Sequence, residues 1–206
     1  MKDLKHLIYF ESLLENANNE LVQKAQAEGN LALGYTCYHV PETLLNVGNC
    51  FSVRLRAPNT GSIDIATYYM SNYTCEFARA LVERGIEGGY QFLDAMIGVD
   101  ACSMMNRAME HFEILKVNEK RSFFVTHCDI PYKITDYTLD SYVKQMRIHV
   151  LDKLTEVYGV DTSDAAIRQA VAEHNEVCSI VSEMAEMRKA ENPVITGYEF
   201  HVINLV

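Results

Sequence analysis

The sequence contains no cysteine pair separated by two residues, no run of lysine or arginine, and no apolar stretch long enough to span a bilayer. The missing Cys-x-x-Cys pair excludes zinc ribbons, thioredoxin-like motifs and the ferredoxin cysteine run. The missing basic run and a formal net charge of -10 argue against a nucleic-acid partner, because a phosphate backbone requires a concentrated basic surface. Asp94 and Asp100 bound the apolar stretch 95–99, so we expect no membrane partner.

Targeting and nucleotide-binding signals are missing as well. Asp3, Glu11 and Glu15 interrupt the segment where a signal peptide would have its apolar core, so we expect a cytoplasmic protein. The sequence has no Gly-x-Gly-x-x-Gly word and no P-loop lysine, and it therefore indicates no dinucleotide or ATP site. Its 206 residues, 49% hydrophobic and 22% charged, are typical of one soluble globular domain.

Hydrophobic patterning predicts four strands, at 31–36, 51–55, 92–99 and 122–126, with helices before, between and after them. A first helix is expected over 4–27, and two long helices follow the last strand, ending at Gly159 and near Ala190. Strands separated by helices pair in parallel, because a parallel partner needs a crossover connection. We therefore expect an α/β fold with a doubly wound, mostly parallel four-stranded sheet (Rossmann/flavodoxin-like) and additional long helices.

Pro193 interrupts the helical pattern and marks a predicted boundary. Residues 1–192 are interpreted as an amino-terminal α/β domain that carries the cysteine segments. Residues 193–206 end in an apolar tail, 200–206. This tail is either the start of a second domain that the chain lacks or a short strand that docks onto the first domain.

Six cysteines are present, and a reducing cytoplasm leaves them as buried thiols, metal ligands or reactive thiols. Ligands of parallel sheets bind outside the carboxyl ends of the strands. Four of the six are expected at that edge, whereas Cys50 is expected at the opposite edge and Cys178 lies far along a helix; the four are Cys37, Cys75, Cys102 and Cys128.

Cys75 and Cys102 are also predicted to lie at helix starts. Free backbone N–H groups and the helix dipole favour thiolate there, and thiolates suit zinc and iron–sulfur clusters. The alternative is that the cysteines only fill space, because free cysteine is among the most frequently buried residue types. The spacing alone leaves both interpretations open.

Three sequence words that contain cysteines are GYTCYHVPE at 34–42, NYTCEFAR at 72–79 and DAMIGVDAC at 94–102. In this order they resemble segments of the 2-hydroxyacyl-CoA dehydratase and benzoyl-CoA reductase family, specifically the amino-terminal part of a D-component-like subunit. The resemblance implies a [4Fe–4S] cluster, or a double-cubane cluster, with Cys75 and Cys102 as ligands, Cys37 as a third candidate, and a further cysteine outside this chain. One departure is Glu76, where the family usually has proline.

The family resemblance also implies a function. Such a chain would be part of a subunit of an iron–sulfur dehydratase that removes water from a 2-hydroxyacyl-CoA by radical chemistry. The implied partners are the acyl-CoA substrate, a second dehydratase subunit and an ATP-dependent iron–sulfur activator protein. The alternatives are a double-cubane or benzoyl-CoA-type reductase component, and a non-catalytic α/β module with structural cysteines.

Other candidate residues receive structural interpretations. His174 and Cys178 have the spacing of metal ligands on a helix, but they fall on an apolar stripe, which predicts a histidine of the core. His39 and His127 are hypothesised to face the crevice at the carboxyl edge as hydrogen-bond donors. The aromatic group at 68–73 could line an acyl pocket, and core packing is favoured for it.

Overall fold

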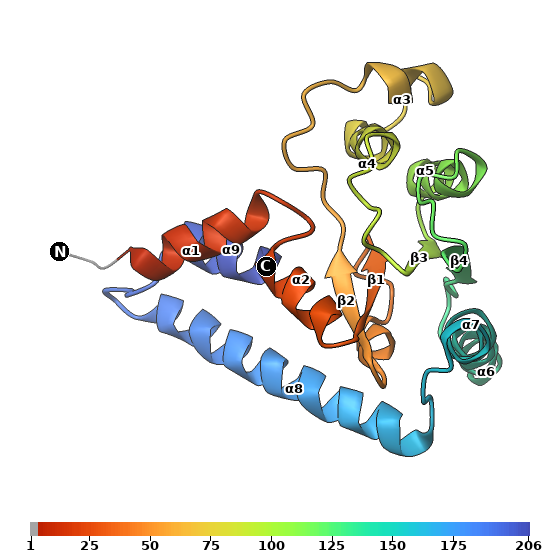
Figure 1. The fold of residues 1–206 in the computed structure, drawn as a ribbon. Coiled ribbons are helices and arrows are strands. Elements are labelled where there is room, and N and C mark those ends of the chain that lie inside the picture. The colour runs from red at the N-terminus through yellow and green to blue at the C-terminus, as the bar shows by residue number, and fades with distance from the viewer. Residues whose placement is uncertain (1–3) are drawn as a thin grey trace.

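The computed structural model describes residues 4–206, and a four-stranded parallel sheet lies at its centre (Figure 1). The spatial order of the strands is β2-β1-β3-β4. Their bounds are β1 Leu31–Tyr35, β2 Cys50–Arg54, β3 Ala95–Asp100 and β4 Phe124–Asp129. This order is flavodoxin-like, with its topological switch point between β1 and β3. The predicted α/β class and the parallel four-stranded sheet are confirmed.

One face of the sheet is covered by α2 (Glu20–Ala27), α3 (Asp64–Tyr69), α4 (Glu76–Ile86) and α5 (Ser103–Ile114). Leu81 of α4 and Phe112 of α5 pack with Met96 of β3, and all three are fully buried. Both helices return antiparallel to the strands. They therefore begin at the same edge of the sheet, the edge where the strands end (Figure 1).

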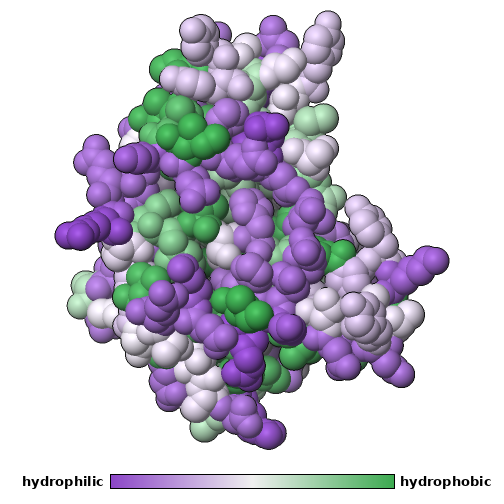
Figure 2. Space-filling model, turned by 90° about the vertical axis from the view of Figure 1, so that its right-hand side faces the viewer, coloured by the Kyte–Doolittle hydropathy of each residue, from purple (hydrophilic) through white to green (hydrophobic). Residues whose placement is uncertain are grey.

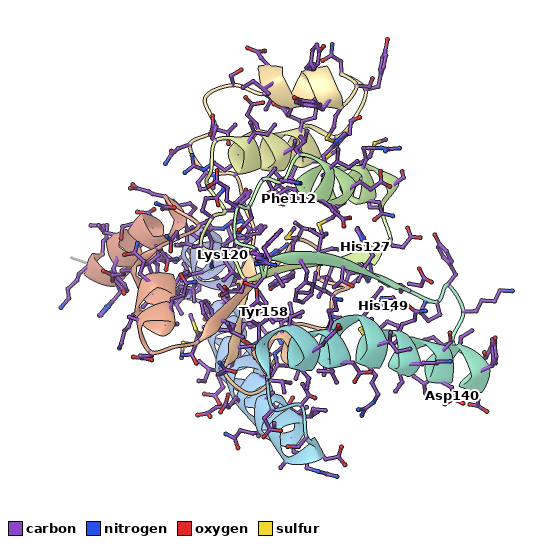
Figure 3. The ribbon with its side chains drawn as sticks, turned by 45° about the vertical axis from the view of Figure 1, so that its right-hand side comes forward. Phe112, Lys120, His127, Asp140, His149 and Tyr158 are labelled. Carbon is purple, nitrogen blue, oxygen red and sulfur yellow. The ribbon has the colours of Figure 1, made fainter. Side chains whose placement is uncertain are left out.

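The other face is covered by the short helix η1 (Glu42–Asn46) and by one long helix made of α6 (Asp136–Met146), a π-helical turn η2 (Arg147–Leu151) and α7 (Asp152–Tyr158). Met146, Val150 and Leu154 of the predicted apolar stripe are buried there. Leu139 and Val143 of the same stripe are exposed, because the first half of α6, with Asp140, extends away from the strands (Figure 3). Helices thus cover both faces, as a doubly wound sheet requires.

The segment predicted as one helix over 4–27 forms two helices, α1 (Lys5–Leu14) and α2. The cause is local: the Asn19 side chain accepts hydrogen bonds from the backbone N–H groups of Leu21 and Val22 and begins α2. Helix α8 (Asp164–Glu186) leads through the 3-10 turn η3 (Met187–Lys189) to α9 (Gly197–Leu205). Figure 1 shows α9 beside α1, so the tail is a helix and not the predicted short strand.

Two strand boundaries differ from the prediction by three residues, and the others differ by two residues or fewer. β3 begins at Ala95 instead of 92, and β4 extends to Asp129 instead of ending at 126. β4 continues through polar residues because each of them pairs with β3, for example Cys128 with Val99. The predicted boundary at Pro193 between two domains remains a prediction. No helix in the described part of the chain has both the length and the apolar character needed to cross a membrane.

Candidate functional site

Cys75 and Cys102 lie at the carboxyl edge of the sheet, and each is the residue that caps the start of a helix, α4 and α5 respectively. Both thiols are exposed, and neither makes a capping hydrogen bond to its own helix. Each sulfur therefore lies where unpaired backbone N–H groups and the positive end of a helix dipole favour an anion. The two helices pack side by side on one face of the sheet. The predicted placement of these two cysteines at helix starts is confirmed.

Arg79 holds the loop that precedes Cys75. Its Nε donates to the backbone carbonyl of Thr74 at 3.2 Å, and its Nη1 donates to the hydroxyl of Thr67 at 2.8 Å. One turn into α4, the guanidinium therefore ties the end of the loop to α3. Sequence reasoning included Arg79 in a family word but assigned it no role. Only the tertiary contact with Thr67 indicates that it positions Cys75.

Cys37, the third predicted ligand, lies two residues after β1. It is half-buried and packs against the core on the η1 side of the sheet. Cys75 and Cys102 begin helices on the opposite face. Cys37 is therefore at the expected edge, but its thiol is less accessible than the other two.

Cys128 was predicted to follow the fourth strand, and this placement is wrong. It is a residue of β4 with a fully buried side chain, and burial raises the pKa of its thiol to about 11. Cys50 begins β2 at the opposite edge, as expected, and burial raises its pKa to about 12. Both environments favour the neutral thiol over the thiolate that metals bind, so these two cysteines are core residues.

The two exposed thiols at the carboxyl edge of the sheet suit soft metals, but they are too few to complete a metal site. Two exposed thiols at helix N-termini fit the ligands of an iron–sulfur cluster in chemistry and charge. Within residues 4–206, however, no three histidine, cysteine or acidic side chains come together as a metal site. Any cluster held by Cys75 and Cys102 therefore needs ligands beyond this pair.

Exposed aromatic side chains surround the edge. Tyr73 and Tyr132 are 96% and 97% exposed, and Tyr38, Tyr68 and Tyr137 are also largely exposed. They follow β1, β2 and β4 in the chain. Core packing, which the sequence favoured for the group at 68–73, is wrong for its tyrosines and correct only for Met70. Large exposed aromatic groups are typical of surfaces that another protein covers.

The two histidines hypothesised to face the crevice differ in position. His39 is exposed, with its ring centroid 4.1 Å from that of Tyr38. His127 on β4 (Figure 3) points towards α5, because a Cβ at Gly98 would meet Met109 and the His127 ring. Its Nε2 is buried and has no hydrogen-bond partner in the described structure. His39 therefore remains a candidate hydrogen-bond donor at the carboxyl edge of the sheet. His127 instead lies between β4 and α5.

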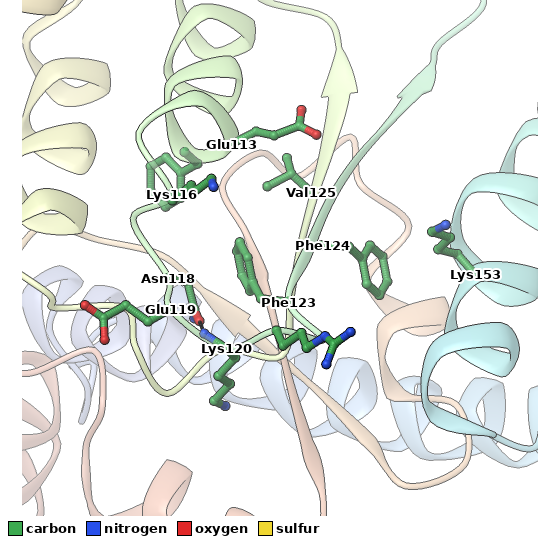
Figure 4. A pocket seen from close by; sticks show the side chains of 11 residues that line it. Glu113, Lys116, Asn118, Glu119, Lys120, Phe123, Phe124, Val125 and Lys153 are labelled. Carbon is green, nitrogen blue, oxygen red and sulfur yellow. Dashed lines mark hydrogen bonds between the residues drawn. The ribbon is translucent and has the colours of Figure 1, made fainter.

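A cavity of about 790 Å³ lies away from these cysteines (Figure 4). It borders the beginning of β4, where Phe123 and Phe124 point to opposite sides, and it extends from Lys116 to Lys153 of α7. Figure 2 shows this side of the molecule, on which small hydrophobic patches lie among hydrophilic residues. Lys120, at the cavity wall, already pairs with Asp94 at 2.8 Å. This cavity is at the edge where strands begin, so it does not share the cysteine site.

Comparisons with known proteins agree with the three sequence words. The model of the family described as 2-hydroxyglutaryl-CoA dehydratase, D-component, matches residues 37–206, which include Cys37, Cys75 and Cys102. This chain belongs to that family. The D-component match thus covers β2, β3, β4 and all helices from α3 to α9.

Two curated proteins are similar to this D-component family member. The (R)-phenyllactyl-CoA dehydratase beta subunit of Clostridium sporogenes is 19% identical over 187 residues, 91% of this chain and 49% of the relative. The (R)-2-hydroxyglutaryl-CoA dehydratase subunit beta of Acidaminococcus fermentans is 21% identical over 176 residues, 81% of this chain and 45% of the relative. The chain spans about half the length of these relatives.

Proposed function

We propose that this chain is part of a beta-type subunit of an iron–sulfur 2-hydroxyacyl-CoA dehydratase that works in the cytoplasm, where thiols stay reduced. Cys75 and Cys102 would bind the iron of a [4Fe–4S] cluster, with Cys37 as a third candidate and a cysteine outside this chain completing the set. When bound, such a cluster would supply a single reducing electron and a Lewis-acidic iron. The substrate would be an acyl-CoA thioester with a 2-hydroxyl group.

The observation that carries this proposal is the pair of exposed thiols that begin two adjacent helices at one edge of the sheet. The residues of the chain would keep both sulfurs anionic through the two helix N-termini and would fix Cys75 through Arg79. Glu76 in the first turn of α4 also lies in this positive field, which offsets part of its repulsion of an anionic cluster.

Partners are proposed on two grounds. The relatives carry the name beta subunit, so each belongs to an enzyme with further subunits. The exposed tyrosines around the carboxyl edge offer a surface that another subunit, or an ATP-dependent activator that delivers the electron, would cover. A covered site would also exclude oxygen and water from the iron.

The test is iron binding by the full chain, produced without oxygen and with a small thiol present to occupy open iron positions. We expect iron, acid-labile sulfide and a broad visible absorbance that bleaches on reduction. Cys75→Ser and Cys102→Ser should each remove most of the iron. Cys178→Ser is the matched control, because Cys178 is also exposed but lies on α8, and the iron content of this variant should equal that of the unchanged chain.

An iron-free, folded protein under these conditions would contradict the proposal and favour the non-catalytic α/β module. Equal iron loss in all three serine variants would instead indicate unspecific binding. With an activator, ATP and a candidate thioester, release of water identifies a dehydratase, whereas reduction of an acyl-CoA identifies the reductase alternative.

A further inference from the structure

A second cavity, about 560 Å³, lies where the carboxyl ends of β1 and β2 meet α8 and α9. Cys37, Cys75 and Cys102 do not line it. One wall is apolar and comes from α8 and α9, with Val177, Val181, Ile203 and Leu205. The facing wall is polar and comes from β1, η1 and β2, with Tyr35, Glu42, Ser52 and Arg54. His174, Cys178 and Ser182 of α8 also line it, together with Asn204 and Val206.

Cys178 and His174 form a thiol–imidazole pair at this cavity. The Cys178 sulfur lies 3.4 Å from Nε2 of His174, and the thiol is exposed. The sequence predicted His174 in the core, but His174 is only partly buried and Cys178 is exposed, because most of α8 extends beyond the sheet (Figure 1). Residues four apart on a helix are neighbours by spacing alone. This pair differs from other helical neighbours because it borders a cavity and because the imidazole of His174 can accept the proton of the Cys178 thiol.

The side chains of the polar wall differ in whether they already have a hydrogen-bond or ion-pair partner. Glu42 already has a partner, because the Ser52 hydroxyl donates to it at 3.0 Å. Burial first, and then Glu42, raise the pKa of Tyr35, which therefore stays protonated. Arg54 ends β2 and makes no ion pair within the described residues. A carboxylate that enters the cavity would thus find one unpaired guanidinium, which binds carboxylates in a forked geometry.

We propose that this cavity is a binding site for small carboxylates and that Cys178, with His174 as its base, is a nucleophilic thiol within it. Arg54 would bind the carboxylate, and the apolar wall would contact the short carbon chain. If the bound acid carries an electrophilic carbon, the Cys178 sulfur attacks that carbon. The new S–C bond forms as the bond to the leaving group breaks, the leaving group departs with the electron pair, and the thiol proton passes to His174.

The test uses two alkylating probes that differ in charge, iodoacetate and iodoacetamide, on the full chain. Site-resolved mass spectrometry gives the alkylation rate at Cys178 for each probe. The ratio of the iodoacetate rate to the iodoacetamide rate is divided by the same ratio for N-acetylcysteine. We expect a normalised ratio of about five, which corresponds to the upper range of a solvent-exposed ion pair. Butyrate should slow the iodoacetate reaction in a saturable way.

Three variants separate the roles of the residues. Arg54→Gln should return the normalised ratio to about one, and Arg54→Lys should keep most of the preference. His174→Gln should lower both rates. Arg107→Gln on α5 is the matched control, since Arg107 is an exposed arginine that already pairs with Glu110. A ratio near one in the unchanged chain, or a preference that survives Arg54→Gln, would overturn the proposal.

Discussion

Gly34 should not tolerate alanine, although the change adds only one methyl group. A Cβ at this position in β1 would lie 2.8 Å from Leu93 Cδ1, 3.1 Å from Met96 Sδ and 3.3 Å from Leu55 Cδ1. These three side chains are at most 1% exposed, so none has open space to move into. Overpacking a core in this way costs about 1–3 kcal/mol. The lower conformational entropy of unfolded alanine relative to glycine returns about 0.5–1 kcal/mol, so the net loss should be about 1 kcal/mol, within a range of about 0–2.5 kcal/mol.

Urea unfolding followed by circular dichroism measures this loss. Gly61→Ala is the control, because a Cβ there meets nothing within 4 Å and its φ is not in the left-handed region. Its stability should be unchanged or higher by about 0.4–1 kcal/mol. In a Leu93→Ala background the nearest obstacle is gone, so Gly34→Ala should cost at least about 0.5 kcal/mol less than in the unchanged chain. Equal costs in the two backgrounds would refute the steric explanation for the glycine that begins the word at 34–42.

Two further predictions concern the cysteine edge and the core thiols. Arg79→Gln should speed hydrogen exchange of the loop near Thr74 and lower the free energy of unfolding by about 1–2 kcal/mol. The reason is that the charged hydrogen bonds to Thr67 and Thr74 are lost. Unchanged hydrogen exchange in that loop would argue against a positioning role for Arg79. Because burial raises the pKa values of Cys50 and Cys128, their folded states keep the proton while the unfolded thiols lose it above about pH 8.5. Unfolding free energy should therefore fall as the pH rises from about 8.5 to 10, and a variant with alanine at both positions should show a shallower fall; identical slopes would contradict the assignment.

Several features of the fold were predictable because their signals are local. Apolar runs bounded by turn residues indicated four strands, and the helices between them required parallel pairing. Helix starts near Cys75 and Cys102 were predicted as well, although each cysteine is itself the cap residue of its helix. The strand order β2-β1-β3-β4 was not predictable, because no local pattern specifies which strand a β-strand will pair with.

The errors have a common physical origin. A stripe of apolar residues at helical spacing predicts a helix, but it does not say whether anything packs on the stripe. Val171 and Cys178 of α8, and Leu139 of α6, satisfy the periodicity and are nevertheless exposed. Cys128 was misplaced for a related reason: its strand continues through polar residues that are held by pairing with β3 and not by their own propensity.

By itself, the sequence determined the alternation of strands and helices, the family words and the two cysteines that begin helices, because periodicity, capping and short motifs are properties of neighbouring residues. Only the tertiary structure decided which thiols are exposed and which are buried, that Arg79 reaches Thr67, and that Arg54 and Cys178 share a cavity. These facts depend on which distant segments pack together, and packing is a property of the whole chain.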